Sequence, residues 1–330
     1  MIILRTCLEY AERLRKIVSR NTLDTECMMF SGGIDTSFIL LSYEKPENLM
    51  IFTTDLGGRD ISYVKKILEK INIREHVIIR ISEEEYEDSI DWVLKNFKTI
   101  DPVEVSGDIV HYMTIKEALK RRCRKIVSGD GGDELFLGYS FLLSKDERFI
   151  REWIKRYSEG EARLPTVEVG SRLGVEVVTP LYVEETRSLA REIPLSCLID
   201  PLKRFGKYFM RLYIAERGFP EIAWRTKDPV NTGSGSMYML HRIVSRFIRE
   251  MNIEDVYKEI ENRMMFRPPT KTHTYLAWRM IRSSIDPPPI YLGEGSCPIC
   301  RRRLVNRYCP FCGAYVDENK IIHHYTDEEF

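Results

Sequence analysis

The strongest constraint in the sequence is the motif SGGIDTS at residues 31–37. It follows the apolar residues 28–30, a run short enough to be a buried strand, and it precedes the apolar residues 38–41, which can begin a helix. Two glycines between a strand and a helix let successive backbone N–H groups face one point, where the helix adds the positive end of its dipole. A phosphate is the natural ligand of such a turn.

This motif contains an aspartate and lacks the lysine of the commonest phosphate-binding loop. Because no lysine follows the glycines, the pattern G-x-x-x-x-G-K-S/T is not met. Asp35 is a poor neighbour for an anion unless a cation lies between them, so the turn suits a magnesium pyrophosphate. Taken alone, the stretch also fits an ordinary strand-to-helix turn that uses glycine for its shape.

A second glycine-rich turn, SGDGGDELFLGY, occupies residues 128–139. Its first seven residues contain three glycines and three carboxylates. Close like charges repel one another unless a cation or a shared proton relieves them. The composition therefore favours a ligand site over a solvated acidic turn.

The spacing of apolar residues predicts an α/β fold. Strands separated by helices of ordinary length indicate a parallel sheet with helices on both faces, and ligands bind such sheets beyond the carboxyl ends of the strands. Both glycine turns follow predicted strands. We expect strands at 28–30, 49–54, 77–81 and 125–127, an extended piece at 175–180, and helices at 3–19, 61–71, 83–97, 114–122, 205–217, 237–250 and 253–264.

Charge and hydropathy exclude some classes of protein. Lys plus Arg and Asp plus Glu number 50 each, so no global field draws the chain to nucleic acid or to an anionic membrane. Nothing approaches the ~20 apolar residues of a membrane span, and we expect a cytoplasmic protein with no membrane partner. Four scattered cysteines have apolar or helical neighbours and are expected to be small core residues: Cys7, Cys27, Cys123 and Cys197.

The other four cysteines form two C-x-x-C pairs near the end of the sequence. Cys297 and Cys300 are separated by eight residues from Cys309 and Cys312, a spacing that predicts a closed tetrahedral zinc site with a structural role. His323 is then expected at the surface rather than on the metal. The arginines between the two pairs, with the aromatic residues beside them, fit either a tip that contacts RNA or a solvated charged face: Arg301, Arg302, Arg303, Arg307, Tyr308 and Phe311.

The two glycine turns and a later segment resemble the synthetase domain of the glutamine-dependent asparagine synthetases and of β-lactam synthetase, within the PP-loop ATP pyrophosphatases. The turns are similar to their S-G-G-x-D-S-S and S-G-E-G-x-D-E-L-F-G-G-Y motifs, and residues 224–227 (WRTK) with the glycines at 233–235 resemble their W-R-x-K stretch. The resemblance covers about residues 20–285. It implies a doubly wound parallel sheet of the adenine-nucleotide α-hydrolase type with a helical C-terminal part.

On this basis the chain divides into an N-terminal helix at 1–20, a synthetase domain at 21–286, and a linker with a zinc ribbon at 287–330. The run Asp286-Pro287-Pro288-Pro289 is a stiff linker by composition.

The resemblance also implies chemistry, in which ATP and magnesium convert a carboxylate into an acyl-adenylate and pyrophosphate before an amine attacks. Lys227 would stabilise the developing charge, and Asp130 would act near the substrate amine or the attacking ammonia. Asp35 and Asp133 would hold magnesium, Asp133 thereby also counting among the catalytic residues. The residues implied to bind the pyrophosphate are Ser31, Gly32, Gly33, Thr36 and Ser37, and those implied to border the adenosine are Phe30, Thr54, Ser128 and Gly129.

Three departures from the family pattern bear on the substrate. Residue 2 is Ile2, where the family's glutaminase domain has its nucleophilic cysteine, so ammonia is expected to come free or from a separate donor of ammonia or sulfur. Asp130 stands in place of a glutamate, which draws the carboxylate back by roughly 1.5 Å, one C–C bond. The zinc ribbon is an addition.

Three functions therefore stay open at the level of sequence. The first is an amide ligase with aspartate as the default substrate. The second is an enzyme that adenylates RNA or protein, for amidation or thiolation, and docks its substrate on the ribbon. The third is a nucleotide-binding module without catalysis. The oligomeric state is not predicted.

Overall fold

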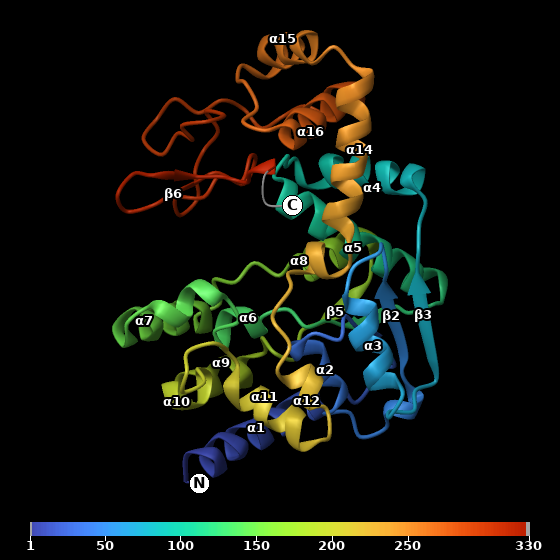
Figure 1. Ribbon diagram of the computed structural model, residues 1–330, viewed down its shortest axis with the longest axis vertical. Helices are drawn as coiled ribbons and strands as arrows, with labels where there is room; N and C mark the ends of the chain where they lie inside the picture. The colour runs from blue at the N-terminus through green and yellow to red at the C-terminus, as the bar shows by residue number, and fades with distance from the viewer. Residues whose placement is uncertain (1, 328–330) are drawn as a thin grey trace. The chain divides into compact units, whose positions relative to one another are not determined.

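The computed structural model describes residues 2–327 (Figure 1). Its contacts divide the chain into two compact units. The first unit comprises Met1–Asp55, Arg59–Ile79 and Thr114–Pro229, and the second comprises Leu56–Gly58, Arg80–Met113 and Val230–Phe330. Both units are therefore assembled from stretches that are distant in the sequence.

The first unit is built on a five-stranded sheet in which every neighbouring pair is parallel. The strand order is β3-β2-β1-β4-β5, so the direction of winding reverses between β1 and β4. Met28 at the centre of β1 pairs with Ile51 on one side and with Val127 on the other. The strands are β1 (Cys27–Met29), β2 (Met50–Thr54), β3 (Glu75–Ile79), β4 (Lys125–Val127) and β5 (Glu176–Val178). The predicted doubly wound α/β class is confirmed.

The central strands are apolar because helices cover both faces of the sheet. Met28, Ile51 and Val127 are completely buried, as expected for strands that never face water. Helices of this unit are α1 (Ile2–Asn21), α2 (Ile34–Leu40), α3 (Asp60–Leu68), α6 (Gly132–Leu135), α7 (Glu147–Ser158), α8 (Pro165–Leu173), α9 (Glu184–Glu192), α10 (Leu195–Leu198), α11 (Tyr208–Glu216) and α12 (Pro220–Ala223), with 3₁₀ turns at Pro46–Asn48 and Ser140–Ser144.

The second unit is mainly helical. It contains α4 (Glu83–Phe97), α13 (Val230–Gly233), α14 (Ser236–Glu250), α15 (Ile253–Met264), α16 (Lys271–Arg282) and the short antiparallel pair β6 (Tyr315–Val316) and β7 (Ile322–His323), while α5 (Pro102–Lys120) begins here and ends in the first unit. None of the helices within residues 2–327 combines the length and apolar character needed to cross a membrane.

Among the differences from the sequence-based expectation are two long helices, α5 and α16. The prediction placed a helix only at 114–122, but α5 begins at Pro102. Its first half is buried on most sides, so its apolar residues show no one-sided period. The helix α16 was not predicted, although Thr270 caps it by accepting a hydrogen bond from the backbone N–H of His273.

The four scattered cysteines are buried, as predicted, but the expectation that each is a lone core residue is wrong. Cys7 is bonded to Cys197, and Cys27 is bonded to Cys123. The first bridge joins α1 to α10, and the second joins the start of β1 to the residues just before β4. Because the bonded cysteines are 190 and 96 residues apart in the sequence, no local pattern predicts either disulfide.

Both disulfides should contribute to stability. In the chain-entropy account, a bridge that closes a loop of about 100 residues stabilises the folded state by about 4.7 kcal/mol. The double variants Cys7→Ala/Cys197→Ala and Cys27→Ala/Cys123→Ala, which leave the other four cysteines intact, should therefore each unfold at a lower urea concentration than the parent protein. An identical midpoint for all three proteins would contradict the assignment.

Candidate active site

The two glycine turns meet where β1 and β4 end, at the point where the winding of the sheet reverses. Ligands bind open α/β sheets at such a point. The second turn lies directly against Asp35 of the first: a Cβ added to Gly132 would fall 2.3 Å from Asp35 Oδ1, and one added to Gly129 would fall 3.2 Å from Asp35 Cβ. Glycine is therefore required by close approach, since a larger residue would separate the turns.

A lysine that the sequence analysis missed connects the two turns. The ammonium of Lys207 is bonded to Asp35 Oδ2 and lies 2.6 Å from Asp133 Oδ1. Its side chain is only 4% exposed, so the bridge is inside the protein. Lys207 precedes α11 and has a left-handed backbone with φ of 56°. The sequence analysis assigned residues 205–217 to a helix and so did not identify Lys207 as a site residue. The one local feature that marks it is a lysine followed by a run of apolar residues.

Lys227 reaches the same cluster from the predicted WRTK segment. Its Nζ atom lies 2.5 Å from Asp133 Oδ2 and 4.4 Å from the centroid of the Tyr139 ring. Asp133 is thus held between two ammonium groups. An added Cβ at Gly138 would fall 1.7 Å from Asp133 Oδ1, so the glycine leaves the space that this carboxylate occupies.

The charges in the cluster shift its protonation equilibria. Burial alone would raise the pKa of Asp133, but Lys207 and Lys227 outweigh it and lower that pKa. Burial and the nearby charge of Asp133 raise the pKa of Asp35 by more than Lys207 and Lys227 lower it. Burial disfavours the ammonium of Lys207, yet Asp133 and Asp35 outweigh this cost and raise the lysine's pKa. The two aspartates and two lysines can therefore keep their charges in the interior only while all four lie together.

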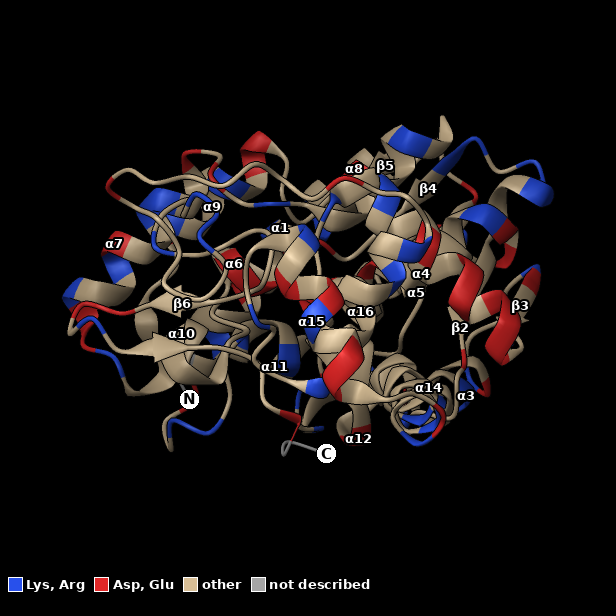
Figure 2. Ribbon diagram, turned by 90° about the horizontal axis from the view of Figure 1, so that it is seen from above, with Lys and Arg blue, Asp and Glu red and all other residues tan. Residues whose placement is uncertain are grey.

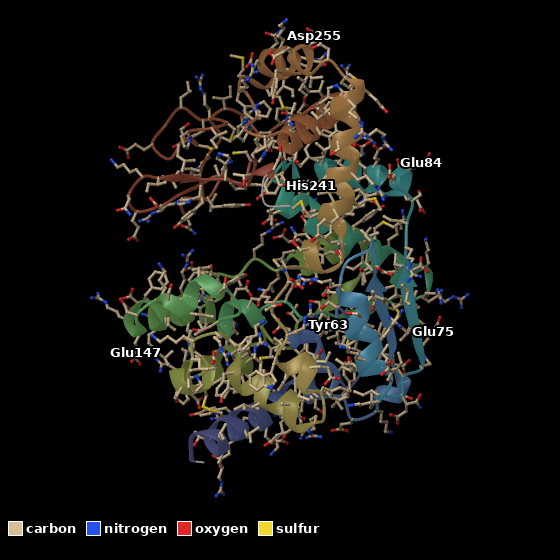
Figure 3. All side chains as sticks on the ribbon, in the orientation of Figure 1. Tyr63, Glu75, Glu84, Glu147, His241 and Asp255 are labelled. Carbon is tan, nitrogen blue, oxygen red and sulfur yellow. A yellow bond between two sulfur atoms is a disulfide. The ribbon has the colours of Figure 1, made fainter. Side chains whose placement is uncertain are left out.

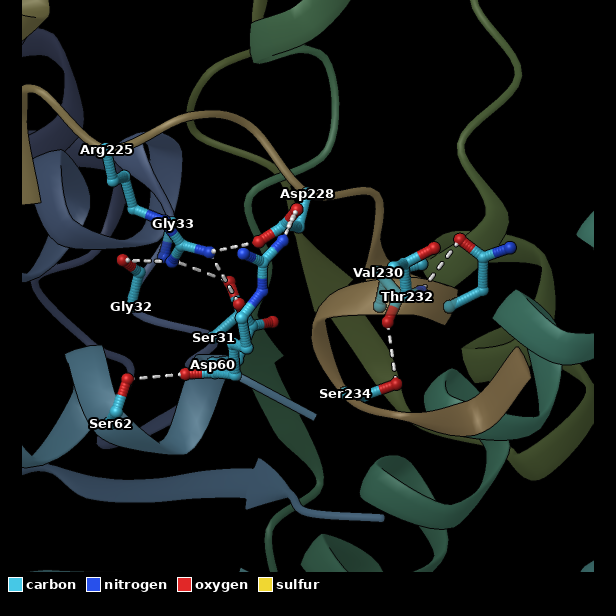
Figure 4. Close-up of polar contacts among 12 residues, drawn as sticks. Ser31, Gly32, Gly33, Asp60, Ser62, Arg225, Asp228, Val230, Thr232 and Ser234 are labelled. Carbon is cyan, nitrogen blue, oxygen red and sulfur yellow. Dashed lines mark hydrogen bonds and ion pairs between the residues drawn. The ribbon is translucent and has the colours of Figure 1, made fainter. Parts of the chain in front are cut away.

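Arg225, also in the WRTK segment, fastens the first glycine turn (Figure 4). It donates one hydrogen bond of 2.9 Å to the carbonyl of Gly32 and another of 2.8 Å to Asp60 Oδ1. Its guanidinium lies 3.9 Å from the ring centroid of Tyr63. Because Arg225 is only two residues from Lys227, one buried side chain fixes both the turn and the segment that carries the second lysine.

The carboxylates present at the site fit a divalent cation. Asp35 Oδ1 is buried and accepts no hydrogen bond from the described part of the chain, and the hydroxyl of Ser37 is in the same condition. A buried oxygen in this state is costly unless a ligand satisfies it. Magnesium prefers carboxylate oxygens and keeps waters and phosphate oxygens as further ligands. Asp35, through Oδ1, and the neighbouring Asp133 are the residues that could hold such an ion.

The remaining predicted residues lie around these turns with partners of their own. Ser31 and Thr36 approach each other with their hydroxyls 3.3 Å apart. The hydroxyl of Thr54 is 2.8 Å from that of Thr114. Phe30 is buried, and its backbone N–H donates to Phe52. The residues predicted to bind pyrophosphate and adenosine thus lie near the carboxyl ends of β1, β2 and β4, in one region of the first unit.

Asp130 is held by the first turn of α8. Its Oδ2 accepts hydrogen bonds from the backbone N–H of Thr166, at 3.1 Å, and from the Thr166 hydroxyl, at 2.7 Å. The Thr166 hydroxyl is also 2.8 Å from that of Ser128. The short aspartate side chain is therefore directed to the positive end of a helix.

The four cysteines predicted to bind a metal come together in the second unit. All four are buried, and their sulfur atoms lie within 4.8 Å of one another. The closest pairs are Cys300 with Cys309, at 3.4 Å, and Cys297 with Cys312, at 3.7 Å. A tetrahedron with metal–sulfur bonds of about 2.3 Å has edges of about 3.8 Å, so the cluster fits one metal ion.

The cysteine cluster is packed onto its unit, and this changes the expectation of a basic tip. Arg302 is 3% exposed, donates a 2.6 Å hydrogen bond to the carbonyl of Cys300 and lies over the ring of Phe311. Arg307 is paired with Glu318 at 3.3 Å. The four arginines are therefore not equivalent, since Arg302 is part of the interior.

The histidines near this cluster behave as the sequence suggested. His323 is exposed and lies 3.1 Å from Asp317. The buried histidine is another one, His273, whose Nε2 is 3.0 Å from the carbonyl of Cys312. Burial lowers its pKa to about 4, so it is neutral at pH 7.

Comparison with known proteins agrees with the site. The family model for asparagine synthase matches residues 9–173, half of the chain. The chain belongs to the asparagine synthase family. It is 28% identical over 280 residues to a Methanocaldococcus jannaschii protein named as an asparagine synthetase (glutamine-hydrolyzing), covering 72% of this chain and 52% of that protein.

A second relative, asparagine synthetase B (glutamine-hydrolyzing) of Escherichia coli, is 21% identical over 286 residues, which cover 79% of this chain and 50% of the relative. The chain thus spans about half the length of the curated relatives it matches. Among solved structures, the U34-tRNA thiolase NcsA of Methanococcus maripaludis with its 4Fe-4S cluster matches at 14% identity over 89% of this chain and 83% of that one, with a TM-score of 0.27. A score this low supports no conclusion about fold or function.

The Arg225–Asp60 pair can be tested by a double-mutant cycle. Arg225→Met leaves the buried Asp60 uncompensated and should reduce the free energy of unfolding by about 3–5 kcal/mol. Adding Asp60→Asn should recover much of this loss, because the buried charge is then gone. Urea unfolding measures all four proteins. Arg59→Ala, which removes an exposed partner of Asp228, is the control and should cost about 1 kcal/mol or less.

The cysteine cluster predicts bound metal that stabilises the fold. Protein purified without chelator should contain one zinc per chain by elemental analysis, and Cys300→Ser should lose it and melt at a lower temperature. His323→Ala is the control and should retain the metal. A metal-free protein that melts like the purified one would contradict the prediction.

Proposed function

We propose that the chain is an ATP-dependent carbon–nitrogen ligase that forms an acyl-adenylate and then an amide. The observation that carries this proposal is the buried cluster in which Lys207 and Lys227 converge on Asp35 and Asp133 beside two glycine turns. Fixed positive charge and paired carboxylates at one point are what the departure of pyrophosphate requires. Membership of the asparagine synthase family supports the same reaction class.

The first step would join a substrate carboxylate oxygen to the α-phosphorus of ATP and break the bond to the β-phosphate, releasing pyrophosphate. The N–H groups and hydroxyls of the SGGIDTS turn would bind the pyrophosphate: Ser31, Gly32, Gly33, Thr36 and Ser37. Lys227 would neutralise the negative charge that develops on the leaving group, with Lys207 beside it. Magnesium held by Asp35 and Asp133 would add electrostatic stabilisation of the phosphates.

In the second step, the nitrogen of ammonia would attack the acyl carbon and AMP would leave. Ammonia is mostly ammonium at neutral pH, so a nearby base is needed, and we assign this role to Asp130. Thr166 would orient that carboxylate through its two hydrogen bonds. Phe30, Thr54, Ser128 and Gly129 would border the adenosine.

The default substrates are aspartate and ammonia, the latter free or supplied by a separate donor protein. Modification of RNA or protein is the alternative, with the cysteine cluster as a docking point. Of the four arginines, Arg302 is buried and Arg307 is paired with Glu318, which leaves Arg301 and Arg303 exposed, so the local basic charge is smaller than the sequence suggested. The third possibility, a nucleotide-binding module without catalysis, is disfavoured because Lys207 contacts both Asp35 and Asp133. Lys227 also contacts Asp133.

We assign zinc to the cysteine cluster. Four sulfur atoms within 4.8 Å of one another are spaced to hold a single ion, whereas an iron–sulfur cluster, with several metal ions of its own, needs thiolates farther apart. The role is structural, since four thiolates leave no position for water. On the basis of the sequence, we propose that the linker and zinc ribbon, from residue 287 onward, form a separate part of the chain.

Because the reaction consumes ATP, we propose a cytoplasmic location. Two disulfides are unusual there, but intracellular proteins of hyperthermophiles do contain them.

Exchange of labelled pyrophosphate into ATP tests the adenylation step directly. With magnesium and aspartate we expect exchange, and Lys227→Met should reduce its rate by about 10²–10³-fold, the effect of removing one transition-state charge partner. Lys70→Met, an exposed lysine in the same unit, is the control and should leave the rate unchanged. A folded protein that shows no exchange with any carboxylate would contradict the proposal.

A further inference from the structure

Lys227 contacts both a charged and an uncharged side chain in the first unit. Its Nζ atom lies 2.5 Å from Asp133 Oδ2 and 4.4 Å from the centroid of the Tyr139 ring. The face of an aromatic ring attracts an ammonium group through its quadrupole, although the ring itself is neutral. Asp133 and Tyr139 can therefore hold Lys227 at one point and yet differ in how much of its charge they cancel.

The proposed function gives Asp133 and Lys227 roles that compete with their mutual contact. Asp133 is one of the two carboxylates that could hold a divalent cation, and a carboxylate engaged in this way attracts a neighbouring ammonium less strongly. Lys227 is assigned to the leaving pyrophosphate, for which an ammonium already neutralised by a carboxylate is a weaker partner. A neutral ring does not enter this competition. Tyr139 is thus the contact that Lys227 can keep while the reaction proceeds.

The Tyr139 side chain is fixed by its hydroxyl and by its ring. The hydroxyl donates a 2.5 Å hydrogen bond to Glu134, whose carbonyl accepts a 2.9 Å hydrogen bond from the indole N–H of Trp153. The ring is stacked on that of Phe141, with centroids 5.8 Å apart, and meets the edge of Trp153 at 6.2 Å. Glu134 directly follows Asp133 in α6, where Figure 2 shows acidic residues in red. The ring and the carboxylate that contact Lys227 are therefore held by one turn.

The hydroxyl of Tyr139 remains a hydrogen-bond donor. Burial raises the pKa of Tyr139, and the negative charge of Glu134 raises it further. The phenol therefore keeps its proton near neutral pH, and the bond to Glu134 serves to hold the ring in place.

The backbone that leads to Tyr139 has an unfavourable conformation. Leu137 is completely buried and has a φ of 59°, in the left-handed region that a leucine rarely adopts. The neighbouring chain lies directly against it, because a Cβ added to Gly206 would fall 1.7 Å from the carbonyl oxygen of Leu137. The next residue, Lys207, donates its backbone N–H to the carbonyl of Phe136 at 2.9 Å. Backbone strain persists only where surrounding contacts over-determine it, so the tertiary structure dictates the position of Tyr139.

The WRTK segment makes a second contact between a cation and a ring. Arg225, two residues before Lys227, has its guanidinium 3.9 Å from the ring centroid of Tyr63, which Figure 3 labels in the first unit. Both basic residues of the segment therefore lie on a tyrosine ring. Arg225 is buried with Asp60 at 2.8 Å and acts as a fixed anchor, whereas the Lys227 side chain is 32% exposed and accessible to a ligand.

Packing alone does not require a tyrosine at this position. Tyr139 packs against the hydrophobic core of the unit, as Trp153 does. A leucine or a phenylalanine could also fill such a place. Leucine, however, offers no ring face to an ammonium, and neither residue offers a hydroxyl to Glu134. Substitutions at Tyr139 therefore distinguish a positioning role from a packing role.

We propose that Tyr139 positions Lys227 for the departure of pyrophosphate: its ring holds the ammonium in place, and Glu134 fixes the ring. This inference rests on the proposed ligase function. Tyr139 is a positioning residue, because it acts through Lys227 rather than on the reacting atoms. A contact between an ammonium and a partly buried ring corresponds to a factor of about 5–30 in an equilibrium or a rate.

Binding of pyrophosphate and its exchange into ATP test this role separately. Calorimetric titration of pyrophosphate in the presence of magnesium needs no turnover, and Tyr139→Leu should weaken this binding by about 5–30-fold. In the exchange assay the same variant should lower kcat by a similar factor with little change in the KM for ATP, because the charge on the leaving group develops only in the transition state. Tyr139→Phe, which keeps the ring without the hydroxyl, should retain more binding and more activity than Tyr139→Leu.

The controls separate the ring face from the packing of the unit. Tyr157→Leu removes a ring that packs on Trp153, with centroids 4.6 Å apart, and should leave pyrophosphate binding and exchange unchanged. Melting temperatures show whether each variant folds, and Tyr139→Met replaces Tyr139→Leu if the latter does not. In Lys227→Met, the addition of Tyr139→Leu should not weaken pyrophosphate binding further, because the side chain that Tyr139 positions is gone.

The outcomes separate this proposal from the ligase function. If Tyr139→Leu binds pyrophosphate and supports exchange as the parent protein does, the positioning role is wrong and the ligase stands. If pyrophosphate binding depends on Tyr139 but no carboxylate supports exchange, the positioning role stands and the ligase function fails. Equal losses of binding in Tyr139→Leu and Tyr157→Leu, or a loss that persists in Lys227→Met, would overturn the proposal, since Tyr139 would then act through packing alone.

Discussion

The buried ammonium of Lys207 between Asp35 and Asp133 is the interaction on which this structure depends. Two carboxylates from different turns would repel each other in a low-dielectric interior, and one lysine that contacts both makes their proximity stable. The glycines of the second turn follow from the same requirement, because Gly132 and Gly138 lie where a side chain would collide with these carboxylates. The site is thus organised by charge compensation at close range.

Several remote features position the parts that carry these charges. Arg225 connects the carbonyl of Gly32 to Asp60 and lies two residues from Lys227, so the glycine turn and the second lysine share one support. The disulfide between Cys27 and Cys123 joins the chain at the entry to the two strands whose exits carry the glycine turns. These connections join the separate stretches of sequence from which the site is made.

The two units place different demands on their polar residues. In the first, buried charges are concentrated where the two glycine turns meet. In the second, Arg302 donates to the carbonyl of Cys300 and His273 lies at the carbonyl of Cys312, so both side chains hold the backbone of the cysteine cluster. The charge cluster and the cysteine cluster therefore belong to different units.

The sequence by itself determined the α/β class, the two glycine turns, the WRTK segment and the four cysteines near the end, because each of these is a local pattern of residue types. It did not reveal Lys207, the partner of Arg225, the bonds of the scattered cysteines or the buried state of Arg302. Each depends on residues far apart in the chain: Lys207 is 172 positions from Asp35, and Cys7 is 190 from Cys197. Only the tertiary structure decided these pairings, since a local pattern carries no information about which distant stretch will supply the compensating charge or the second sulfur.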